Sequence, residues 1–440
     1  MSFPFRQSSF PEKLFSMSSA PSLSLLAASL FLAAASPGAS PPSPIAISFS
    51  SAVSRALAKN PTVLVAREET RRAAALVEEA RAAALPALSA STSYTNIDHN
   101  REFGGVIFIP QNQLIASLSL ALPLAVPRAW VGWAHAQDNA SVARRGEADA
   151  RRQLAVAAAK AWLALLAQHR VVEVTRDAVA NARAHDADAR ARLSAGWGNR
   201  VDVARAASAL ASDEAQDEAA RSALTRLQEA LGVLVGEDRP LDARVEPTLP
   251  EAPSLADALA SARSRPDVAL AEERLTAARH VARDTWAEYV PFLTGLGLPY
   301  YTNPPTPTQP EFGYEIQLVL SWPIYEGGLR GGEGRERDAL VAEARDALDG
   351  ALRQAASDVR AAEDVLARAR RSLASAEEAA REAADARRLT ALAYKAGAGT
   401  NLEVVDAETT DLYAQTAAVV AEDAVREAQL DLLYAAGRFP

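Results

Sequence analysis

Four short stretches of the chain alternate between apolar and small or polar residues. In residues 114–122 the apolar positions are Leu114, Ala116, Leu118, Leu120 and Leu122, with Ser117 and Ser119 between them. A period of two is typical of a β-strand with one apolar face. We therefore predict strands at residues 87–95, 114–122, 292–300 and 314–322. Each has about nine residues, the length that a tilted strand needs to cross a bilayer.

The second pair of predicted strands alternates in the same way with larger side chains. Its predicted apolar positions are Phe292, Thr294, Leu296, Leu298 and Tyr300, then Ile316, Leu318, Leu320 and Trp322. Aromatic residues lie at strand ends, as in the girdle of a membrane barrel: Tyr94, Tyr300, Tyr301, Tyr314 and Trp322. A soluble sheet packed on a core is the alternative. We predict that residues 96–113 and the proline-rich residues 302–312 are loops.

Two much longer segments have a helical pattern. Residues 335–396 repeat every seven residues, with one seam at Leu352, Val359, Leu366, Leu373 and Ala380 and a second at Ala355, Ala362, Ala369, Ala376 and Ala383. Residues 129–195 repeat likewise at Ala158, Leu165, Val172, Val179 and Leu193, with a break at Asp186. A sustained heptad predicts helices paired as a coiled coil. Each helix of about 65 residues would be roughly 100 Å long.

Each long helix ends in a glycine-containing turn and a return helix, predicted at residues 201–235 and 402–436. In the second turn, Thr400 or Asn401 can cap the new helix, and glycine suits the left-handed end of the preceding one. Acidic side chains crowd the first turns of that return helix: Glu403, Asp406, Glu408 and Asp411. The positive end of the helix dipole favours them there. A well-capped turn with no further role is the alternative.

The pattern occurs twice. Gly196, Gly198 and Asp202 of the first turn correspond to Gly397, Gly399 and Glu403, each 201 residues later. A shorter helix at residues 51–85 is interrupted at Pro61 and ended by Pro86. Both prolines recur 205 residues later as Pro266 and Pro291, in the same places of a helix at residues 254–290. We therefore predict a duplicated unit. The simplest packing places one proline-flanked helix and one return helix end to end along each long helix.

Composition limits the kind of protein. The 440 residues include no cysteine, and the net charge of -9 argues against nucleic acid as a partner. Residues 1–36 have a basic start, a short apolar segment and small residues, which predicts a cleaved signal peptide; a retained anchor is the alternative. No later stretch has 18 consecutive apolar residues, so any membrane contact would have to use strands. The predicted domains are the signal peptide, an extended segment at 37–50, a first repeat at 51–235, a linker at 236–253 and a second repeat at 254–440.

Four strands cannot close a membrane barrel, and unpaired edges are costly in lipid. We therefore expect several copies of the chain to share one barrel. In this arrangement, and in the segments LSWPIYEGG (320–328) and AYKAGAGTNLEVVDAE (393–408), the chain resembles the TolC-type outer-membrane efflux family over nearly its whole mature length.

The resemblance implies a mainly α-helical protein with a small β part. A homotrimer would form a twelve-stranded barrel in the outer membrane and a coiled-coil α-helical tunnel in the periplasm. It would act as the passive exit duct of a tripartite efflux or type I secretion system. Its implied partners are a periplasmic adaptor, an inner-membrane transporter and outer-membrane lipid. A periplasmic coiled-coil scaffold or adaptor without a pore is the alternative.

The resemblance also implies roles for residues at the two tips. Asp202, Glu403 and Asp406 match acidic positions of the periplasmic entrance, and Tyr394 matches a tyrosine that helps to close it. Gly399 stands where an arginine completes the closing contacts in the best-known member, so closure is expected either to be weaker or to use Lys395 or Arg200. The turn glycines Gly196, Gly198, Gly397 and Gly399 would lie where the partner docks.

Elementary electrostatics supports the acidic positions independently. Glu403 and Asp406 are three residues apart and so lie on one helix face. Three copies of these and Asp202 would gather nine carboxylates at a narrow mouth, and rings of carboxylates favour cations. A solvated acidic cap is the alternative.

We expect no enzymatic activity, no cofactor and no metal site. The glycine-rich residues 327–332 lack the spacing of a phosphate loop and are predicted to be a flexible joint between barrel and tunnel. The five histidines, His99, His135, His169, His185 and His280, show no metal-ligand spacing. We expect His169 and His185 to be solvated on a charged helix. The absence of cysteine argues against copper or silver as cargo.

Overall fold

The computed structural model describes residues 43–439, so the predicted signal peptide lies outside the described residues. The described part is mainly helical, with a small β part, as predicted. Within residues 43–439, no helix combines the length and the apolar character needed to cross a membrane.

The helices and strands follow one another along the chain in this order: β1 (Ile45–Ala46), α1 (Phe49–Lys59), α2 (Pro61–Ala82), β2 (Ala87–Asn96), β3 (Arg101–Phe103), β4 (Val106–Ile109), β5 (Asn112–Ala125), α3 (Pro127–Ser194), α4 (Arg200–Val235), β6 (Leu241–Asp242), α5 (Leu255–Ala262), α6 (Pro266–Arg283), the 3-10 helix η1 (Asp284–Glu288), β7 (Phe292–Asn303), β8 (Phe312–Ser321), α7 (Leu329–Lys395) and α8 (Asn401–Ala435).

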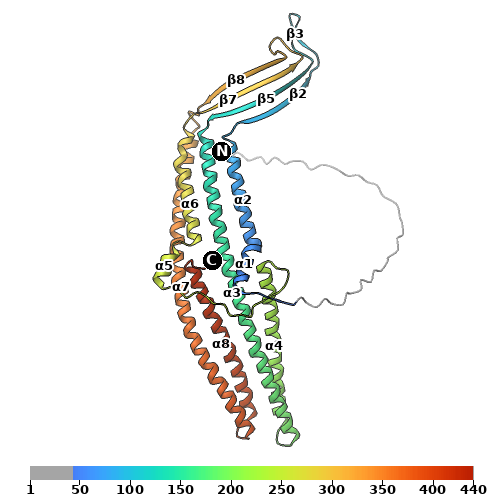
Figure 1. The fold of residues 1–440 in the computed structure, drawn as a ribbon, viewed down its shortest axis with the longest axis vertical. Coiled ribbons are helices and arrows are strands. Elements are labelled where there is room, and N and C mark those ends of the chain that lie inside the picture. The colour runs from blue at the N-terminus through green and yellow to red at the C-terminus, as the bar shows by residue number, and fades with distance from the viewer. Residues whose placement is uncertain (1–42, 440) are drawn as a thin grey trace, which may run out of the picture. The chain divides into compact units, whose positions relative to one another are not determined.

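The two long helices α3 and α7 organise the helical part. Helices α2 and α4 both pack on α3, and α6 and α8 both pack on α7. In each case the proline-flanked helix lies on the half nearer the sheet and the return helix on the other half (Figure 1). Helices α6 and α8 also contact α3, so α3 touches helices from both halves of the sequence. The predicted end-to-end packing is therefore confirmed.

The predicted heptad positions of α7 face the interior of this packing. Ala355, Val359 and Leu366 are buried. They belong to a cluster with residues of α5 and α8, because alanine at every second seam position lets the helix backbones approach closely. Asp186, where the heptad of α3 is interrupted, is also buried, and its carboxylate accepts a hydrogen bond from Arg190 Nε at 2.7 Å.

The four long strands form one antiparallel sheet in the order β2-β5-β7-β8. Its register pairs Leu120 with Leu88 on one side and with Gly297 on the other, and Gly297 with Ile316. Residues directly opposite one another in antiparallel strands lie on the same face. The leucines of β5 therefore share a face with the glycines of β7 and the large apolar residues of β8.

This register corrects the predicted apolar face of β7. Leu296 and Leu298 pair with Gln317 and Glu315, so the alternation from Phe292 to Tyr300 lies on the more polar face of the sheet. The apolar face uses the other alternation of β7, which includes Gly295. Side chains of the neighbouring strands cover this glycine: a Cβ there would meet Leu122 and Leu318 at 3.6 and 3.7 Å.

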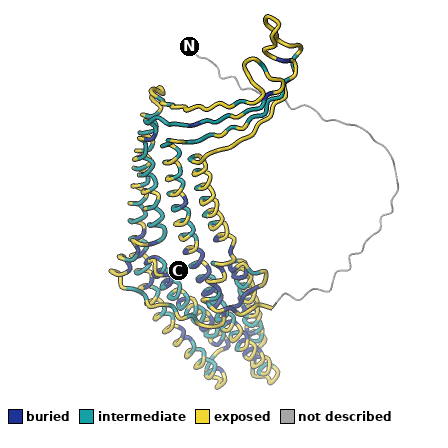
Figure 2. The backbone as a smooth tube through the Cα atoms, turned by 45° about the horizontal axis from the view of Figure 1, so that its top comes forward, coloured by how far each residue is buried: buried dark blue, intermediate teal, exposed yellow. Residues whose placement is uncertain are grey.

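The apolar face of the sheet is open in the single chain. Leu88, Ile316 and Leu318 are 69%, 76% and 71% exposed. Figure 2 shows exposed residues along the outer strands β2 and β8. An extensive exposed apolar surface of this kind marks contact with a membrane or a partner.

Two of the predicted connections differ from the structure. The predicted loop at residues 96–113 contains a hairpin, β3–β4. Its turn consists of Gly104 and Gly105, both at positive φ. Helix α7 begins at Leu329, so most of the glycine-rich stretch is helical and the predicted flexible joint is wrong for those residues. Among the glycines of residues 327–332, only Gly327 and Gly328 have positive φ, 63° and 89°.

The predicted linker at residues 236–253 also pairs with the start of the described chain, because β6 and β1 form a short parallel ladder. Beside it lies the larger core cluster, which includes Trp162 of α3. Trp162 is completely buried, and its Nε1 donates to the Ile47 carbonyl at 3.2 Å. Its ring meets Phe49 edge to face at 5.5 Å. This cluster fixes the N-terminal segment against the middle of α3.

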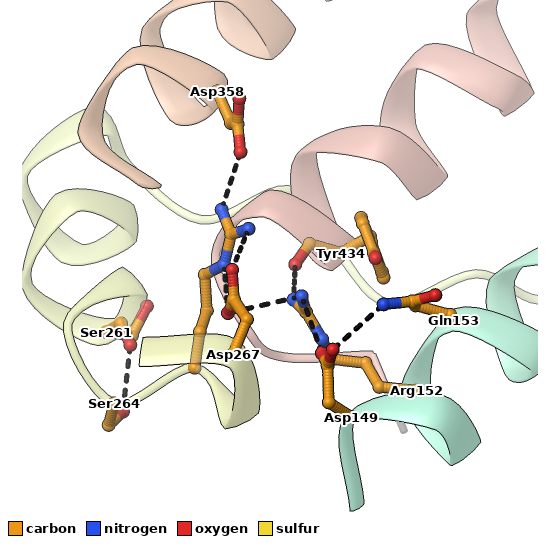
Figure 3. A network of polar contacts seen from close by, with 9 residues as sticks. Asp149, Arg152, Gln153, Ser261, Ser264, Asp267, Asp358 and Tyr434 are labelled. Carbon is orange, nitrogen blue, oxygen red and sulfur yellow. Dashed lines mark hydrogen bonds and ion pairs between the residues drawn. The ribbon is translucent and has the colours of Figure 1, made fainter. Parts of the chain in front are cut away.

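A buried polar network joins four helices at the same level (Figure 3). Arg265, at the start of α6, binds both oxygens of Asp267 at 2.7 and 3.0 Å and Asp358 of α7 at 2.9 Å. Arg152 of α3 approaches Asp267 at 3.3 Å and donates to the Tyr434 carbonyl of α8. Although burial acts in the opposite sense, the two arginines hold the pKa of Asp267 below its ordinary value.

We expect Arg265→Ala to destabilise the protein by about 2 kcal/mol, because it leaves the half-buried Asp358 without its ion pair and leaves Asp267 paired with Arg152 alone. Thermal unfolding followed by circular dichroism measures the effect. The matched control is Arg263→Ala, an exposed arginine two residues earlier in the chain. Equal melting temperatures for the two variants would show that the network contributes nothing.

Candidate functional site

The candidate site lies at the ends of two helical hairpins, α3–α4 and α7–α8, which we call the first and second hairpin. Gly196 and Gly397 take positive φ, 79° and 77°, immediately after α3 and α7. Gly198 and Gly399 lie against the preceding helix ends, where a Cβ would come within 2.9 and 3.1 Å of backbone nitrogen. The four glycines thus permit two tight turns with the same geometry.

The return helices begin with side-chain caps. Asn199 accepts a hydrogen bond from the Asp202 amide at 2.8 Å. At the second turn Thr400 and Glu403 form a capping box, in which Glu403 accepts from the Thr400 amide at 2.8 Å. Glu403 therefore has a structural role at the start of α8, whatever other role it has. Asp406, one turn later, is exposed, and Asp202 is half-buried.

One buried side chain connects the two tips. Asn401 of α8 donates from Nδ2 to the Asp202 carbonyl of α4 at 3.2 Å. Its Oδ1 accepts from His185 Nε2 of α3 at 2.6 Å. Asn401 is 3% exposed and His185 is 7% exposed. The structure thus brings Asp202 next to the N-terminus of α8.

The expectation that His169 and His185 are solvated is wrong. His185 is buried between the hairpins, and His169 lies against the buried Asp242 carboxylate, with 2.5 Å between Nε2 and Oδ1. Both belong to α3, whose face toward the other helices cannot be recognised from neighbouring charges alone.

Tyr394 is held by an arginine that the sequence reasoning did not select. The Arg192 guanidinium lies over the Tyr394 ring at 4.1 Å, and Nη2 donates to the Tyr394 carbonyl at 2.9 Å. His185 packs against the same ring at 5.4 Å. Burial raises the pKa of Tyr394. Arg192 therefore links the end of the first hairpin to the end of the second.

For the two basic residues expected to replace the missing arginine, a role in closing the entrance stays a prediction. Within residues 43–439, neither Lys395 nor Arg200 forms an ion pair. No sequence signal singled out Arg192, and none assigned His185 or Asn401 a partner in the other hairpin. Each of these three residues contacts a partner that lies about 200 residues away in the chain.

Among residues 43–439, no group of three or more histidine, aspartate or glutamate side chains is placed so that it could hold a metal ion. The site instead combines half-buried and exposed carboxylates, a stacked Arg–Tyr pair and neutral hydrogen bonds. Such an arrangement can position charge and hold two hairpins together.

Comparisons with known proteins identify similar chains. A family model described as "Outer membrane efflux protein" matches residues 52–237 and 258–438. A search of curated protein sequences finds no match.

Several solved structures share the fold at low sequence identity. A membrane protein from Pseudomonas aeruginosa is 20% identical, with a TM-score of 0.78 over 88% of this chain and 90% of that one. The outer membrane protein VceC from Vibrio cholerae is 19% identical, with a TM-score of 0.73 over 88% and 96%. The CmeC outer membrane channel from Campylobacter jejuni is 17% identical, with a TM-score of 0.77 over 89% and 86%.

Proposed function

The chain belongs to the outer membrane efflux protein family, and from this premise we propose that it is the outer-membrane exit duct of a tripartite efflux or type I secretion system. The family places it in transport at the outer membrane. The observation that carries the proposal is the sheet: four strands of 10 to 14 residues with an apolar face open in the single chain.

We propose that three copies complete the barrel. The sheet has two unpaired outer strands, β2 and β8, and such edges are not tolerated in lipid. Joining β8 of one copy to β2 of the next closes a ring of twelve strands. Exposed aromatic residues at both ends of the strands, including Tyr94, Tyr314 and Trp322, suit the two membrane interfaces.

The helices would continue this ring as a periplasmic tunnel. Helices α2 and α7 lie on opposite sides of the helical layer, beyond α3 and α6, and would meet in neighbouring copies. The two separate family matches support a duplicated unit. The hairpin turns, with Gly196, Gly198, Gly397 and Gly399, would then form the periplasmic end. A periplasmic adaptor and an inner-membrane transporter would dock there.

We place the gate at the same end. Asp202, Glu403 and Asp406 would line the entrance in three copies, and Tyr394 would hold it closed through Arg192. The Asn401 contact with the Asp202 carbonyl supports this placement, because it keeps the acidic starts of α4 and α8 together.

Single-channel recording of the purified protein in a planar bilayer tests the function. We expect stable, cation-selective openings. Silence of both the wild-type protein and its tip-neutralised variant would contradict a pore and favour a periplasmic scaffold.

The variant Asp202→Asn/Glu403→Gln/Asp406→Asn is expected to lower the cation preference and to abolish block by a trivalent cation, because it removes nine carboxylates from the trimeric mouth. Glutamine at position 403 retains an oxygen for the Thr400 amide. The ratio of cation to anion permeability measures the effect.

The matched control for this variant is Glu69→Gln/Glu78→Gln/Glu79→Gln, which removes the same charge from exposed positions of α2. Unchanged selectivity and block in the tip variant would reject the acidic entrance.

A further inference from the structure

An acidic cavity of about 220 Å³ lies between the two hairpins, at the level of residues 174–181 of α3 and 408–415 of α8. All four hairpin helices line it. Its charged side chains are Asp177 of α3, Asp213 of α4, Arg387 of α7, and Glu408 and Asp411 of α8. The cavity therefore collects four carboxylates and one guanidinium.

Two of these four carboxylates, Glu408 and Asp213, have no ion pair within residues 43–439, whereas Asp177 lies 4.0 Å from Arg176. Arg387 Nε lies 2.7 Å from Asp411 Oδ2, so these two residues form an ion pair, although that Nε makes no hydrogen bond among the described residues. Glu408 Oε2 is buried and has no hydrogen-bond partner among residues 43–439. Burial, followed by the charge of Asp213, raises the pKa of Glu408 to about 7, although Arg387 acts in the opposite sense. Burial raises the pKa of Asp213 as well.

A smaller cavity of about 180 Å³ continues from Glu408 toward the tips. It adds the remaining charged and titratable groups that line this region from the packed helices: His185 and Asp188 of α3, and Tyr394 and Lys395 of α7. Within the described part of the chain, Lys395 has no ion pair and His185 is bonded to the neutral Asn401 side chain. The region around Glu408 and Asp213 therefore keeps an excess of acidic groups.

The hairpins are attached on both sides of this acidic region. Toward the tips, Asn401 joins His185 and the Asp202 carbonyl. Toward the middle of the long helices, α3 and α8 are joined by ion pairs of Arg170 with Glu422 and of Lys160 with Asp431. Glu408 and Asp213 lie between these attachments, where no opposite charge pairs with them.

We propose that Glu408 and Asp213 form a proton-sensitive contact that sets the spacing of the two hairpins. With Glu408 protonated, only one of these two carboxylates of the cavity is charged, and the hairpins pack together. When both are ionised, their repulsion and the cost of burying charge favour separation. The consequence of this proton-sensitive contact for export rests on the proposed channel function, in which separation of the hairpins would widen the entrance.

The direction of the pH effect follows from linkage. The packed state raises the affinity of Glu408 for its proton, and hydration of a separated Glu408 returns its pKa toward 4.5. Lower pH therefore favours the packed state, and the effect builds up as pH falls from about 7 to 4.5. Between pH 7.5 and 5.5 the ratio of packed to separated hairpins is expected to rise about 20-fold per protomer.

Spin-label distance measurements test this on the purified full-length protein in detergent. The chain has no cysteine, so Ser212→Cys and Thr409→Cys, both exposed, provide clean labelling sites on α4 and α8. We expect the distance between the labels to shorten as pH falls from 7.5 to 5.5. In Glu408→Gln, which mimics the protonated side chain, the short distance should persist at both pH values.

The matched control is Glu218→Gln, an exposed carboxylate five residues beyond Asp213 on the same helix, which should retain the wild-type pH response. The proposal is overturned by a pH-independent distance in the wild type, or by a Glu408→Gln profile that follows the wild type. Bilayer recordings on the unlabelled protein keep the two proposals separate: a pore with pH-independent hairpins refutes only this contact, and pH-dependent hairpins without a pore refute only the channel.

Discussion

Replacing Arg192 by alanine is expected to shift the proposed channel toward its open state. The substitution removes both the guanidinium stacked at 4.1 Å on Tyr394 and the hydrogen bond to the Tyr394 carbonyl. In a half-buried position these contacts together contribute about 2 kcal/mol, which corresponds to about a 30-fold change in the ratio of closed to open states. Single-channel recordings should show longer openings or a higher mean conductance.

Two variants of the same pair refine this expectation. Tyr394→Phe retains the aromatic ring and the backbone carbonyl, so it should behave like the wild-type protein. Tyr394→Ala removes the ring from both Arg192 and His185 and should open the channel as Arg192→Ala does. If Arg192→Ala conducts like the wild type while the tip-neutralised variant alters selectivity, the entrance is acidic but Arg192 does not hold it closed.

Replacing Trp162 by alanine is expected to produce the largest loss of stability, about 3–5 kcal/mol. Its indole is completely buried, donates to the Ile47 carbonyl and packs edge to face on Phe49. The substitution creates a cavity at the point where the N-terminal segment meets α3, and it leaves a buried carbonyl without its donor. The apparent melting temperature in detergent, measured by circular dichroism, should fall by several degrees.

Trp130→Ala provides the comparison for this variant, since Trp130 lies on the same helix but is 46% exposed. Its expected loss is small. Equal melting temperatures for the two variants would mean that the core around Trp162 does not limit the stability of the folded chain.

Local sequence patterns were sufficient to predict the long helices and the four long strands of the fold, although not the β3–β4 hairpin. A period of two over about nine residues indicated the strands, and a seven-residue repeat indicated α3 and α7, because these periods follow from backbone geometry alone. Proline fixed where the shorter helices begin: Pro61 and Pro266 are the first residues of α2 and α6. The acidic, capped start of α8 was also visible, since a capping box lies within four consecutive residues.

The tertiary structure decided which of these residues meet. A period of two shows that alternate residues of β7 share a face, but not which face contacts the neighbouring leucines. The register with β5 and β8 sets that, and it places Gly295 rather than Leu296 among them. The same limit applies at the tips. Arg192 and Tyr394 are 202 residues apart in the chain, and no local pattern indicates that they are in contact. The packing of α3 against α8 and of the hairpin ends against one another makes His185 a buried hydrogen-bond donor and buries Oε2 of the half-exposed Glu408. Such burial depends on neighbours that are distant in the sequence.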